Sequence, residues 1–479
     1  MERLKKVGQI CPKKSVDIRK SKIGLGFEKL DRDIFDPEEA YQYVAESGVK
    51  WARLQSGWQR TEKTPGVYDF GWLDQIVDRL ISIGVEPWLC LCYGNELYSE
   101  AAKSVFGAVG IPPIHTEAER TAWANYVRAT VAHFKGRIHY YEIWNEPDGT
   151  WCWKHCVEPD GLEYAAFAKA TALACREADP ECEVIGLATC CSKAFVSRFA
   201  ESGALDFIDG LSYHAYSADE KNWTEWVRFY KSIRSEYRPN LKIIQGESGT
   251  QSRSDGAGAL RGGAWTEKKQ AKYLLRHLIT DLANGVELTS YFSCMDMAEA
   301  LNGTVGNAVS YRDYGYFGVL RSGFNSNGKT AGACSPKPSY FALQTLCSVL
   351  SEEYECCEVP LNGLVLDSGR LLGKDYDFEN TAHYAFKRAD GSYAVMYWVP
   401  KSILSETYEG TVSVALNEAL RGKDICLTDL LDGSVYRLSG DMIGENGVLK
   451  NLPATDSPLM LTFGPFSEWT KSEVPAAFQ

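Results

Sequence analysis

The strongest constraint on the fold is an alternation of short apolar runs with amphipathic stretches, which continues to about residue 345. Strands that alternate with helices predict a parallel sheet, because each helix carries the chain back across the sheet. Eight strand-like runs can be counted: Lys22 to Phe27, Lys50 to Gln55, Val85 to Cys92, His139 to Trp144, Glu183 to Ala188, Gly210 to His214, Leu241 to Gln245 and Glu287 to Ser293. This number predicts a closed (β/α)8 TIM barrel over residues 21–348, and it disfavours the alternative of an open doubly wound sheet.

The stretches between these runs have the apolar period of helices. Trp72 to Ile83 places apolar side chains at helical spacing, and Glu119 to Phe134, Leu162 to Ala178 and Lys268 to Ala283 are similar. Glycines such as Gly84 stand between a helical stretch and the next strand, where a left-handed cap is expected.

The pattern changes after Leu350. Short alternating segments follow, separated by turn signals such as Ala389-Asp390-Gly391. The segments are Ala382 to Lys387, Ser392 to Trp398, Gly410 to Ala415 and Leu459 to Phe463. They predict a C-terminal β-sandwich over residues 349–479, and we expect residues 1–20, which precede the barrel, to join it.

Composition sets limits on the class of partner. A chain of 479 residues is too long for one compact core, and 45% hydrophobic and 24% charged residues are ordinary for a globular protein. The formal charge of −12 argues against nucleic acid, because phosphate binding needs a basic surface. No stretch has the roughly 18 to 20 apolar residues of a membrane span, so no membrane partner is expected.

Fifteen cysteines is a high and odd number. Some lie within predicted core strands, as Cys90 and Cys92 do, and others are adjacent, as Cys190 and Cys191 are. This distribution favours reduced thiols over a disulfide framework. Together with a start that lacks the apolar stretch of a signal peptide, it predicts a cytoplasmic protein, with a periplasmic or secreted one as the alternative if the start is trimmed.

Two carboxylates follow strand-like runs and are the candidate catalytic residues. Glu146 lies in Trp-Asn-Glu-Pro at the end of the fourth run, and Glu247 lies in Gln-Gly-Glu-Ser at the end of the seventh. Each alone could be an ordinary loop or capping acid. The tops of barrel strands face one cleft, however, and strands four and seven lie roughly across it. Such a pair is what glycosidic bond cleavage needs: an acid that protonates the leaving oxygen and a carboxylate that meets the sugar carbon.

Polar residues near the two acids are candidates for substrate binding. Asn145 precedes Glu146 and can bond a sugar hydroxyl. His214 and Tyr216 follow the sixth strand and can reach a carboxylate on a neighbouring strand. Arg53 lies inside the apolar second strand, where a charge needs a carboxylate partner, and Glu247 is the expected one. A buried structural histidine and a salt bridge elsewhere are the alternatives.

Aromatic side chains crowd the predicted loops above the strands, and aromatic rings pack against sugar faces. The further candidates for sugar contact are Trp58, Trp151, Trp153 and Tyr291, together with Asn95 and Glu96, which could bind hydroxyls. Core packing is the alternative for each aromatic residue.

No metal or other cofactor is expected. Cys152, His155 and Cys156 supply three ligand types, but their spacing is not that of a zinc finger. The glycine-rich stretch from Asp255 to Gly263 follows Glu247 instead of opening a helix as a phosphate loop would, so a loop over the cleft is predicted.

With these residues in place, the chain resembles the superfamily of retaining glycoside hydrolases with acids on strands four and seven (clan A). It is most similar to glycoside hydrolase family 39, whose members include β-xylosidases. The resemblance rests on Trp144 to Pro147, His214 to Tyr216 and Glu247, with further similarity in Pro65 to Phe70 and Pro336 to Tyr340. Gly246-Glu247-Ser248 and Tyr291-Phe292 depart from the residues usual at those positions.

The resemblance implies that Glu146 is the general acid/base and Glu247 the nucleophile of a double displacement with retention. It also implies a raised pKa for Glu146, from burial and the nearby Glu247 charge. The expected partner is a glycoside or small oligosaccharide, cleaved from its end in the manner of a β-xylosidase; a β-galactosidase, a β-glucosidase and other clan A glycosidases are alternatives. An inverting enzyme, a transglycosylase, a metal-dependent hydrolase and an inactive carbohydrate-binding barrel are the rival hypotheses. Oligomeric state stays open.

Overall fold

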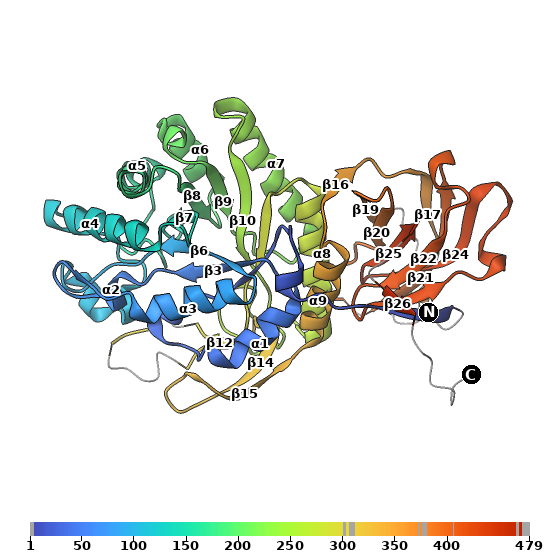
Figure 1. The fold of residues 1–479 in the computed structure, drawn as a ribbon, viewed down its shortest axis with the longest axis horizontal. Helices are drawn as coiled ribbons and strands as arrows, with labels where there is room; N and C mark the ends of the chain where they lie inside the picture. The colour runs from blue at the N-terminus through green and yellow to red at the C-terminus, as the bar shows by residue number, and fades with distance from the viewer. Residues whose placement is uncertain are drawn as a thin grey trace.

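The computed structural model describes residues 4–299, 303–305, 312–371, 374–375, 381–405, 407–465 and 469–471. Within them, eight parallel strands close into a barrel, which lies beside two antiparallel sheets (Figure 1). The prediction of a TIM barrel with a C-terminal β-sandwich is therefore confirmed.

The barrel strands coincide with the eight runs predicted from the sequence. In chain order they are β2 (Ile23–Gly26), β3 (Trp51–Gln55), β6 (Glu86–Leu91), β7 (Tyr140–Ile143), β8 (Glu183–Thr189), β9 (Gly210–Tyr213), β10 (Lys242–Ser248) and β11 (Leu288–Tyr291). Each pairs in parallel with its neighbours, and β11 returns to β2 to close the ring. Because all eight run the same way, their carboxyl ends meet at one rim.

Helices cover the outside of the barrel. They include α1 (Glu38–Ser47), α3 (Gly71–Ser82), α4 (Glu117–Phe134), α5 (Gly161–Ala178), α6 (Lys193–Glu201), α7 (Glu220–Tyr237), α8 (Glu267–Ala283) and α9 (Pro338–Val349). The connection from α3 to β6 shows how tightly they dock. Gly84 has a φ of +85°, and a Cβ there would lie 2.4 Å from the Cα of Val16, so only glycine fits.

The chain after α9 forms the two antiparallel sheets. The larger has the order β16-β19-β20-β25-β22-β23-β1-β26 and the smaller β18-β17-β21-β24. Their bounds are β1 (Lys5–Ile10), β16 (Tyr354–Cys357), β17 (Leu361–Leu371), β18 (Lys374–Asp375), β19 (Ala382–Arg388), β20 (Tyr393–Trp398), β21 (Tyr408–Leu416), β22 (Ile425–Asp429), β23 (Ser434–Arg437), β24 (Val448–Thr455), β25 (Leu459–Phe463) and β26 (Trp469–Lys471). The N-terminal strand β1 pairs with β23, so the two ends of the chain meet in one sheet.

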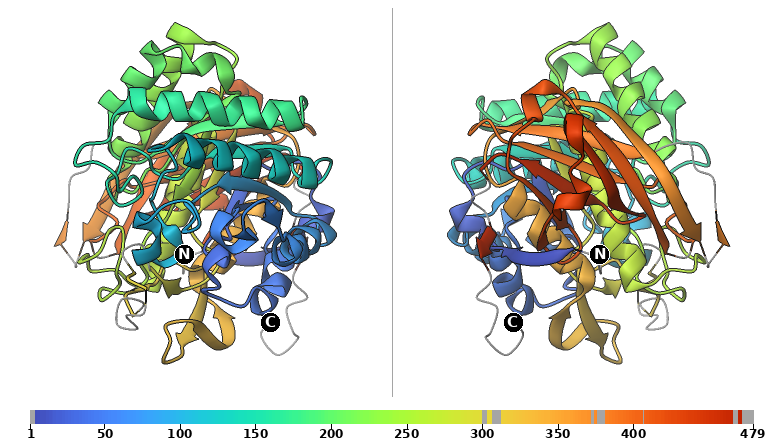
Figure 2. Two further views of the ribbon diagram at one scale, coloured as in Figure 1. Left: turned by 90° about the vertical axis from the view of Figure 1, so that its left-hand side faces the viewer. Right: turned by 90° about the vertical axis from the view of Figure 1, so that its right-hand side faces the viewer.

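Helices α8 and α9 lie between the barrel and the sheets (Figure 1), and Figure 2 shows the barrel helices on one side of the molecule and the sheets on the other. Side chains of α8 cross this boundary. Lys272 bonds Asp456, in the connection from β24 to β25, with an Nζ–Oδ2 distance of 2.5 Å, and both side chains are buried. The sandwich therefore contacts the barrel through α8.

Candidate active site

The two predicted acids lie at the carboxyl ends of β7 and β10. Glu146 comes three residues after β7, with a φ of +45° that places its backbone in the left-handed region. Side chains other than glycine rarely adopt this conformation, and such strain concentrates at functional sites. Glu247 is the penultimate residue of β10. The barrel thus turns both side chains toward the same rim.

The two carboxyl groups are close to each other. An oxygen of Glu146, an oxygen of Glu247 and a ring nitrogen of His214 all lie within 4.8 Å of one another. Carboxyl groups about 5–5.5 Å apart suit attack on the sugar by one of them, whereas inverting enzymes need about 6.5–9.5 Å to admit a water. The short separation therefore suits a covalent double displacement.

Arg53, on β3, joins the groups beneath the acids. Its Nη1 donates to Oε2 of Glu247 at 2.8 Å, its Nη2 to Oδ1 of Asn145 at 2.9 Å, and its Nε to Oε2 of Glu142 at 2.7 Å. The guanidinium has no exposed surface. The predicted partnership between Arg53 and Glu247 is present, and it holds Glu247 and Asn145 in one network.

Glu247 is held from its other side by Tyr216. The Tyr216 hydroxyl donates to Oε1 of Glu247 at 2.6 Å. Burial first, and then the Glu247 charge, raise the pKa of Tyr216 well above its ordinary value, so the hydroxyl keeps its proton. Both oxygens of Glu247 therefore accept hydrogen bonds, which fix the orientation of the carboxyl group.

Glu146 is surrounded by donors. Nδ1 of His214 lies 3.0 Å from its Oε1, and the indole of Trp151 donates to Oε2. Burial raises the pKa of Glu146, but the bond and charge of His214, the Trp151 bond and the Arg53 charge outweigh burial and lower it. The expectation of a raised pKa is wrong, because the sequence indicated these residues but not that they bond or face Glu146.

His214 is buried against the same two acids. Burial alone lowers the pKa of His214, but the charge of Glu247 and the hydrogen bond with Glu146 raise it above its ordinary value overall. His214 and Glu146 therefore form a coupled pair that holds protons jointly.

A cavity of about 550 Å³ opens above these groups. Five predicted site residues line it: Asn145, Glu146, Trp151, Tyr216 and Glu247. Two more, Arg53 and His214, are buried next to these acids. The loop from Gly258 to Arg261 also lines the cavity, as predicted for the glycine-rich stretch.

Five other predicted contacts do not reach the cavity. Trp58 and Trp153 are fully buried, the first stacked on Tyr98 and the second packed on Trp144. Tyr291 is buried with its hydroxyl toward the Thr250 carbonyl, and Asn95 donates to the Glu62 carbonyl. Glu96 is exposed but is not among the residues that line the cavity. The three aromatic rings are packed in the core. A position near a strand end therefore did not predict that a side chain reaches the cavity.

Sequence reasoning missed a charged wall of the same cavity. It consists of Glu28, Lys29, Arg32 and Gln55, with Glu299 and Phe292 facing them. Nζ of Lys29 lies 3.4 Å from Oε1 of Glu299. Glu28 comes two residues after β2, so the strand-end rule that selected Glu146 could have found it.

Cys152, His155 and Cys156, the possible ligand group in the sequence, do not all lie together in the structure. Ligand atoms of His155, Cys156 and Glu163 lie within 4.8 Å of one another, but Cys152 is buried elsewhere, with its sulfur 3.4 Å from Nδ2 of Asn145. Nε2 of His155 lies 2.9 Å from Oε2 of Glu163, a pairing that the sequence did not indicate.

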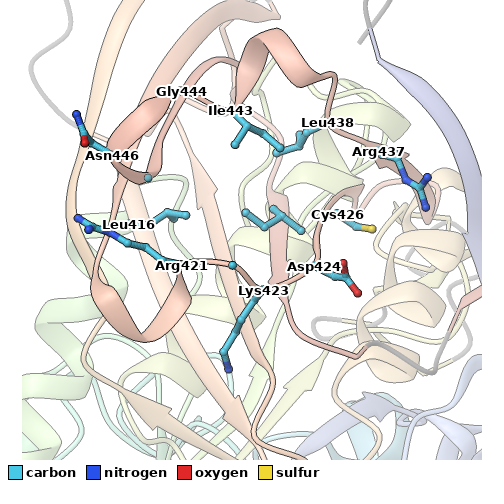
Figure 3. Close-up of a pocket in the computed structure, with 13 residues that line it drawn as sticks. Leu416, Arg421, Lys423, Asp424, Cys426, Arg437, Leu438, Ile443, Gly444 and Asn446 are labelled. Atoms are coloured by element: carbon cyan, nitrogen blue, oxygen red, sulfur yellow. The ribbon is translucent and has the colours of Figure 1, made fainter.

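A second hollow, of about 930 Å³, lies on the sandwich and is shown in Figure 3. Asp424 is the one carboxylate side chain among its lining residues, next to the cations Arg421, Lys423 and Arg437. It lacks the pair of acids that the barrel cavity has. Among the residues that the structure describes, none of the helices combines the length and apolar character needed to cross a bilayer.

Comparison with known proteins connects this geometry to a family. The model described as glycosyl hydrolases family 39 matches residues 38–399. Among curated proteins, a β-xylosidase of Caldicellulosiruptor saccharolyticus is 27% identical over 164 residues, which are 32% of this chain and 32% of that relative. The match thus spans about a third of the relative's length.

Solved structures share the fold. A family 39 glycoside hydrolase from Bacteroides cellulosilyticus has a TM-score of 0.63 at 19% identity, with 92% of this chain and 80% of that chain covered. A family 39 β-xylosidase from Caulobacter crescentus has a TM-score of 0.57 at 18% identity, with coverage of 96% and 98%. At these identities the likeness concerns the fold alone.

Proposed function

The chain belongs to glycosyl hydrolase family 39, and we propose that it cleaves β-type glycosidic bonds with net retention of configuration. The observation that carries the proposal is the separation of at most 4.8 Å between oxygens of Glu146 and Glu247 across one cavity. That spacing is closer to the about 5–5.5 Å between the carboxyl groups of retaining enzymes than to the about 6.5–9.5 Å of inverting ones.

In the first step, Glu247 is the nucleophile. An oxygen of its carboxylate bonds to the anomeric carbon while the bond from that carbon to the leaving oxygen breaks. Glu146 gives its proton to the leaving oxygen. Glu247 suits this role because the hydrogen bonds from Arg53 and Tyr216 hold its two oxygens in place.

In the second step, Glu146 takes a proton from a water, whose oxygen attacks the anomeric carbon and releases Glu247. The sugar leaves with its original configuration, and Glu146 has regained its proton. Since the pKa of Glu146 is lowered, we propose that His214, 3.0 Å away, shares the proton that the leaving group needs. Proton transfer within the pair keeps the acid available near neutral pH.

We propose a small oligosaccharide or glycoside as the substrate, cleaved from its end as a β-xylosidase does. The names of the relatives support the sugar, and the volume of the cavity, about 550 Å³, fits a short ligand. Asn145, Trp151 and Tyr216 are the proposed sugar contacts, since they line the cavity next to the acids. β-Galactosides and β-glucosides are the alternative substrates.

We also propose that the protein works in a reducing compartment. All fifteen cysteines lie within the described residues and are free thiols, and several are buried in the barrel core. Thiols that pack as small apolar side chains fit such an environment.

A panel of nitrophenyl β-glycosides tests the proposal. We expect turnover of at least the xyloside, and its abolition in Glu247→Gln. Glu146→Ala should lose roughly 10²–10⁴-fold on substrates with poor leaving groups, but much less on activated aryl glycosides, which need no protonation. Glu96→Gln, outside the cavity, is the matched control. Undiminished turnover in Glu247→Gln, or equal losses of Glu146→Ala on both substrate types, would refute the assigned roles.

A further inference from the structure

Arg53 is surrounded by more carboxyl groups than its charge can neutralise. The guanidinium has five N–H donors. Nε donates to Glu142. Nη2 donates to Asn145 and also lies 2.6 Å from Oε2 of Glu142. Nη1 serves two carboxyls at once, Glu247 at 2.8 Å and Glu28 at 3.4 Å. One cation therefore faces three acids.

These groups are removed from water. The side chains of Arg53 and Glu142 have no exposed surface, Glu28 is 1% exposed and Glu247 is 12% exposed. If all three acids were ionised, the cluster would hold two uncompensated negative charges. Buried unpaired charges are strongly unfavourable, and such groups bind a proton instead.

Glu28 is the acid with the weakest support for an ionised form. Its contact with Arg53 is the longest of the three. One oxygen of Glu28 and one of Glu142 are buried without a hydrogen-bond partner within the described residues, so the strength of the contact with Arg53 distinguishes them. Glu247 has a second donor in Tyr216, and Glu142 accepts from two Arg53 nitrogens. Hydrogen-bond donors favour the ionised form, so the proton belongs on Glu28.

We propose that Glu28 is a positioning residue that stays protonated in the active enzyme, so that its charge does not draw Arg53 away from Glu247. The inference rests on the proposed role of Glu247 as nucleophile. When Glu28 ionises, it divides the attraction of the Arg53 charge with Glu247 and repels the Glu247 carboxylate from the place where it meets the sugar.

The titration of Glu28 supports this assignment. Burial raises the pKa of Glu28 to about 8, the Arg53 charge opposes it, and the Glu247 charge raises it further. Tyr216 and the Cys294 thiol also face Glu28, and both have pKa values raised mainly by burial, so they carry no charge there. Lys29, the next residue, is turned to the Ala298 carbonyl and Glu299.

The backbone is shaped to hold the Glu28 carboxyl. Gly26, at the end of β2, lies directly beneath it, and a Cβ on Gly26 would come 2.3 Å from Oε2 of Glu28. The absence of a side chain at Gly26 is thus what lets the Glu28 carboxyl fold back toward Arg53.

The pH dependence of an acid-independent reaction tests the proposal. Glu146→Ala removes the titration of Glu146 itself, and an activated dinitrophenyl glycoside needs no protonation. In this background we expect the first-turnover rate to fall about tenfold from pH 7 to pH 9, as one group of pKa about 8 ionises. Glu146→Ala with Glu28→Gln, whose amide cannot ionise, should show a ratio of rates near one. An equal fall in both proteins would overturn the proposal.

Infrared spectroscopy gives a readout that does not depend on turnover. At about pH 7 the difference spectrum between the full chain and Glu28→Gln should contain the carbonyl band of a protonated carboxylic acid, and the band should fall to about half at pH 8 and about a tenth at pH 9. A spectrum without that band shows that Glu28 is ionised and rejects the inference, whatever the enzyme hydrolyses. If the band is present but no glycoside is turned over, the proposed function fails and the proton assignment stands.

Discussion

Glu146 has a richer set of donors than a residue that must give up a proton would be expected to have. Trp151 and His214 both bond it, and Arg53 adds a charge nearby. These contacts fix the orientation of the carboxyl but lower its pKa. We infer that these contacts orient the Glu146 carboxyl group at the expense of its proton affinity. His214 then holds the proton next to Glu146.

Trp151→Phe tests whether the indole donor lowers the pKa of Glu146. The phenyl ring keeps an aromatic face in the cavity but removes the indole donor to Glu146, so the pKa of Glu146 should rise. The alkaline limb of kcat/KM should move up by about half to one pH unit, because Trp151 is partly exposed and its bond is weakened by solvent. Trp72→Phe, which removes an indole bonded to Thr61, is the control. A limb that stays in place or moves down would show that Trp151 does not tune the acid.

The sequence predicted the positions of the two acids better than the hydrogen bonds around them. Glu146, Glu247, Arg53 and Tyr216 were found because charged or polar groups at apolar strand ends need partners. Trp153 was misassigned, since burial among aromatic rings of α5 depends on how helices pack, which no local pattern reveals. The lowered pKa of Glu146 was missed because the direction in which Trp151, five residues away, and His214, 68 residues away, point their donors depends on how the loops fold.

The strand ends are the elements that decide the geometry of the site. Directly after β10, Gly249 passes so close to β11 that a Cβ would lie 1.9 Å from the carbonyl oxygen of Phe292. The two strands that carry Glu247 and the cavity wall are therefore held at a separation that only glycine permits.

Gly249→Ala should push the ends of β10 and β11 apart and move Glu247, two residues away. We expect the free energy of unfolding to fall by about 1–3 kcal/mol, as for overpacked sites. The value of kcat/KM should fall more than tenfold, measured with the best substrate of the panel. Gly440→Ala, where a Cβ meets nothing within 4 Å, should change stability by less than about 0.5 kcal/mol. Equal behaviour of the two variants would contradict the argument.

The eight barrel strands were predictable because each is a buried apolar run, and their number determines the closed ring. The boundaries differ by a few residues; β6 ends at Leu91 where the run continued to Cys92. Register and the irregular segments between strand and helix were not predictable. The charged wall formed by Glu28 and Lys29 belongs to such a segment, where Lys29 has a φ of +68°.

For the molecule as a whole, buried polar contacts join the barrel to the sandwich. Lys272 on α8 pairs with Asp456, and Trp398 on β20 donates to Oε1 of Glu220 on α7 at 2.9 Å. Since α8 connects β10 to β11, the sheets support the strand that carries Glu247. We expect barrel and sandwich to unfold in one cooperative transition.

Lys272→Met tests this coupling. Removing the cation leaves the Asp456 charge buried and unpaired, which should lower the free energy of unfolding by about 3–5 kcal/mol. Adding Asp456→Asn should restore most of the loss, because the amide carries no charge and can still accept from the Tyr408 amide. Urea unfolding of the four proteins measures the coupling free energy. Additive effects of the two substitutions would show that the pair does not join the two parts.

The central claim is that Glu146 and Glu247 act together on one sugar by way of a covalent intermediate. Proton NMR of the first product formed from an aryl β-glycoside tests it most directly. We expect the β-hemiacetal to appear first and to convert to the α form only by slow mutarotation. If the α-hemiacetal appears first, a water attacks the sugar in a single displacement, and the claim is wrong.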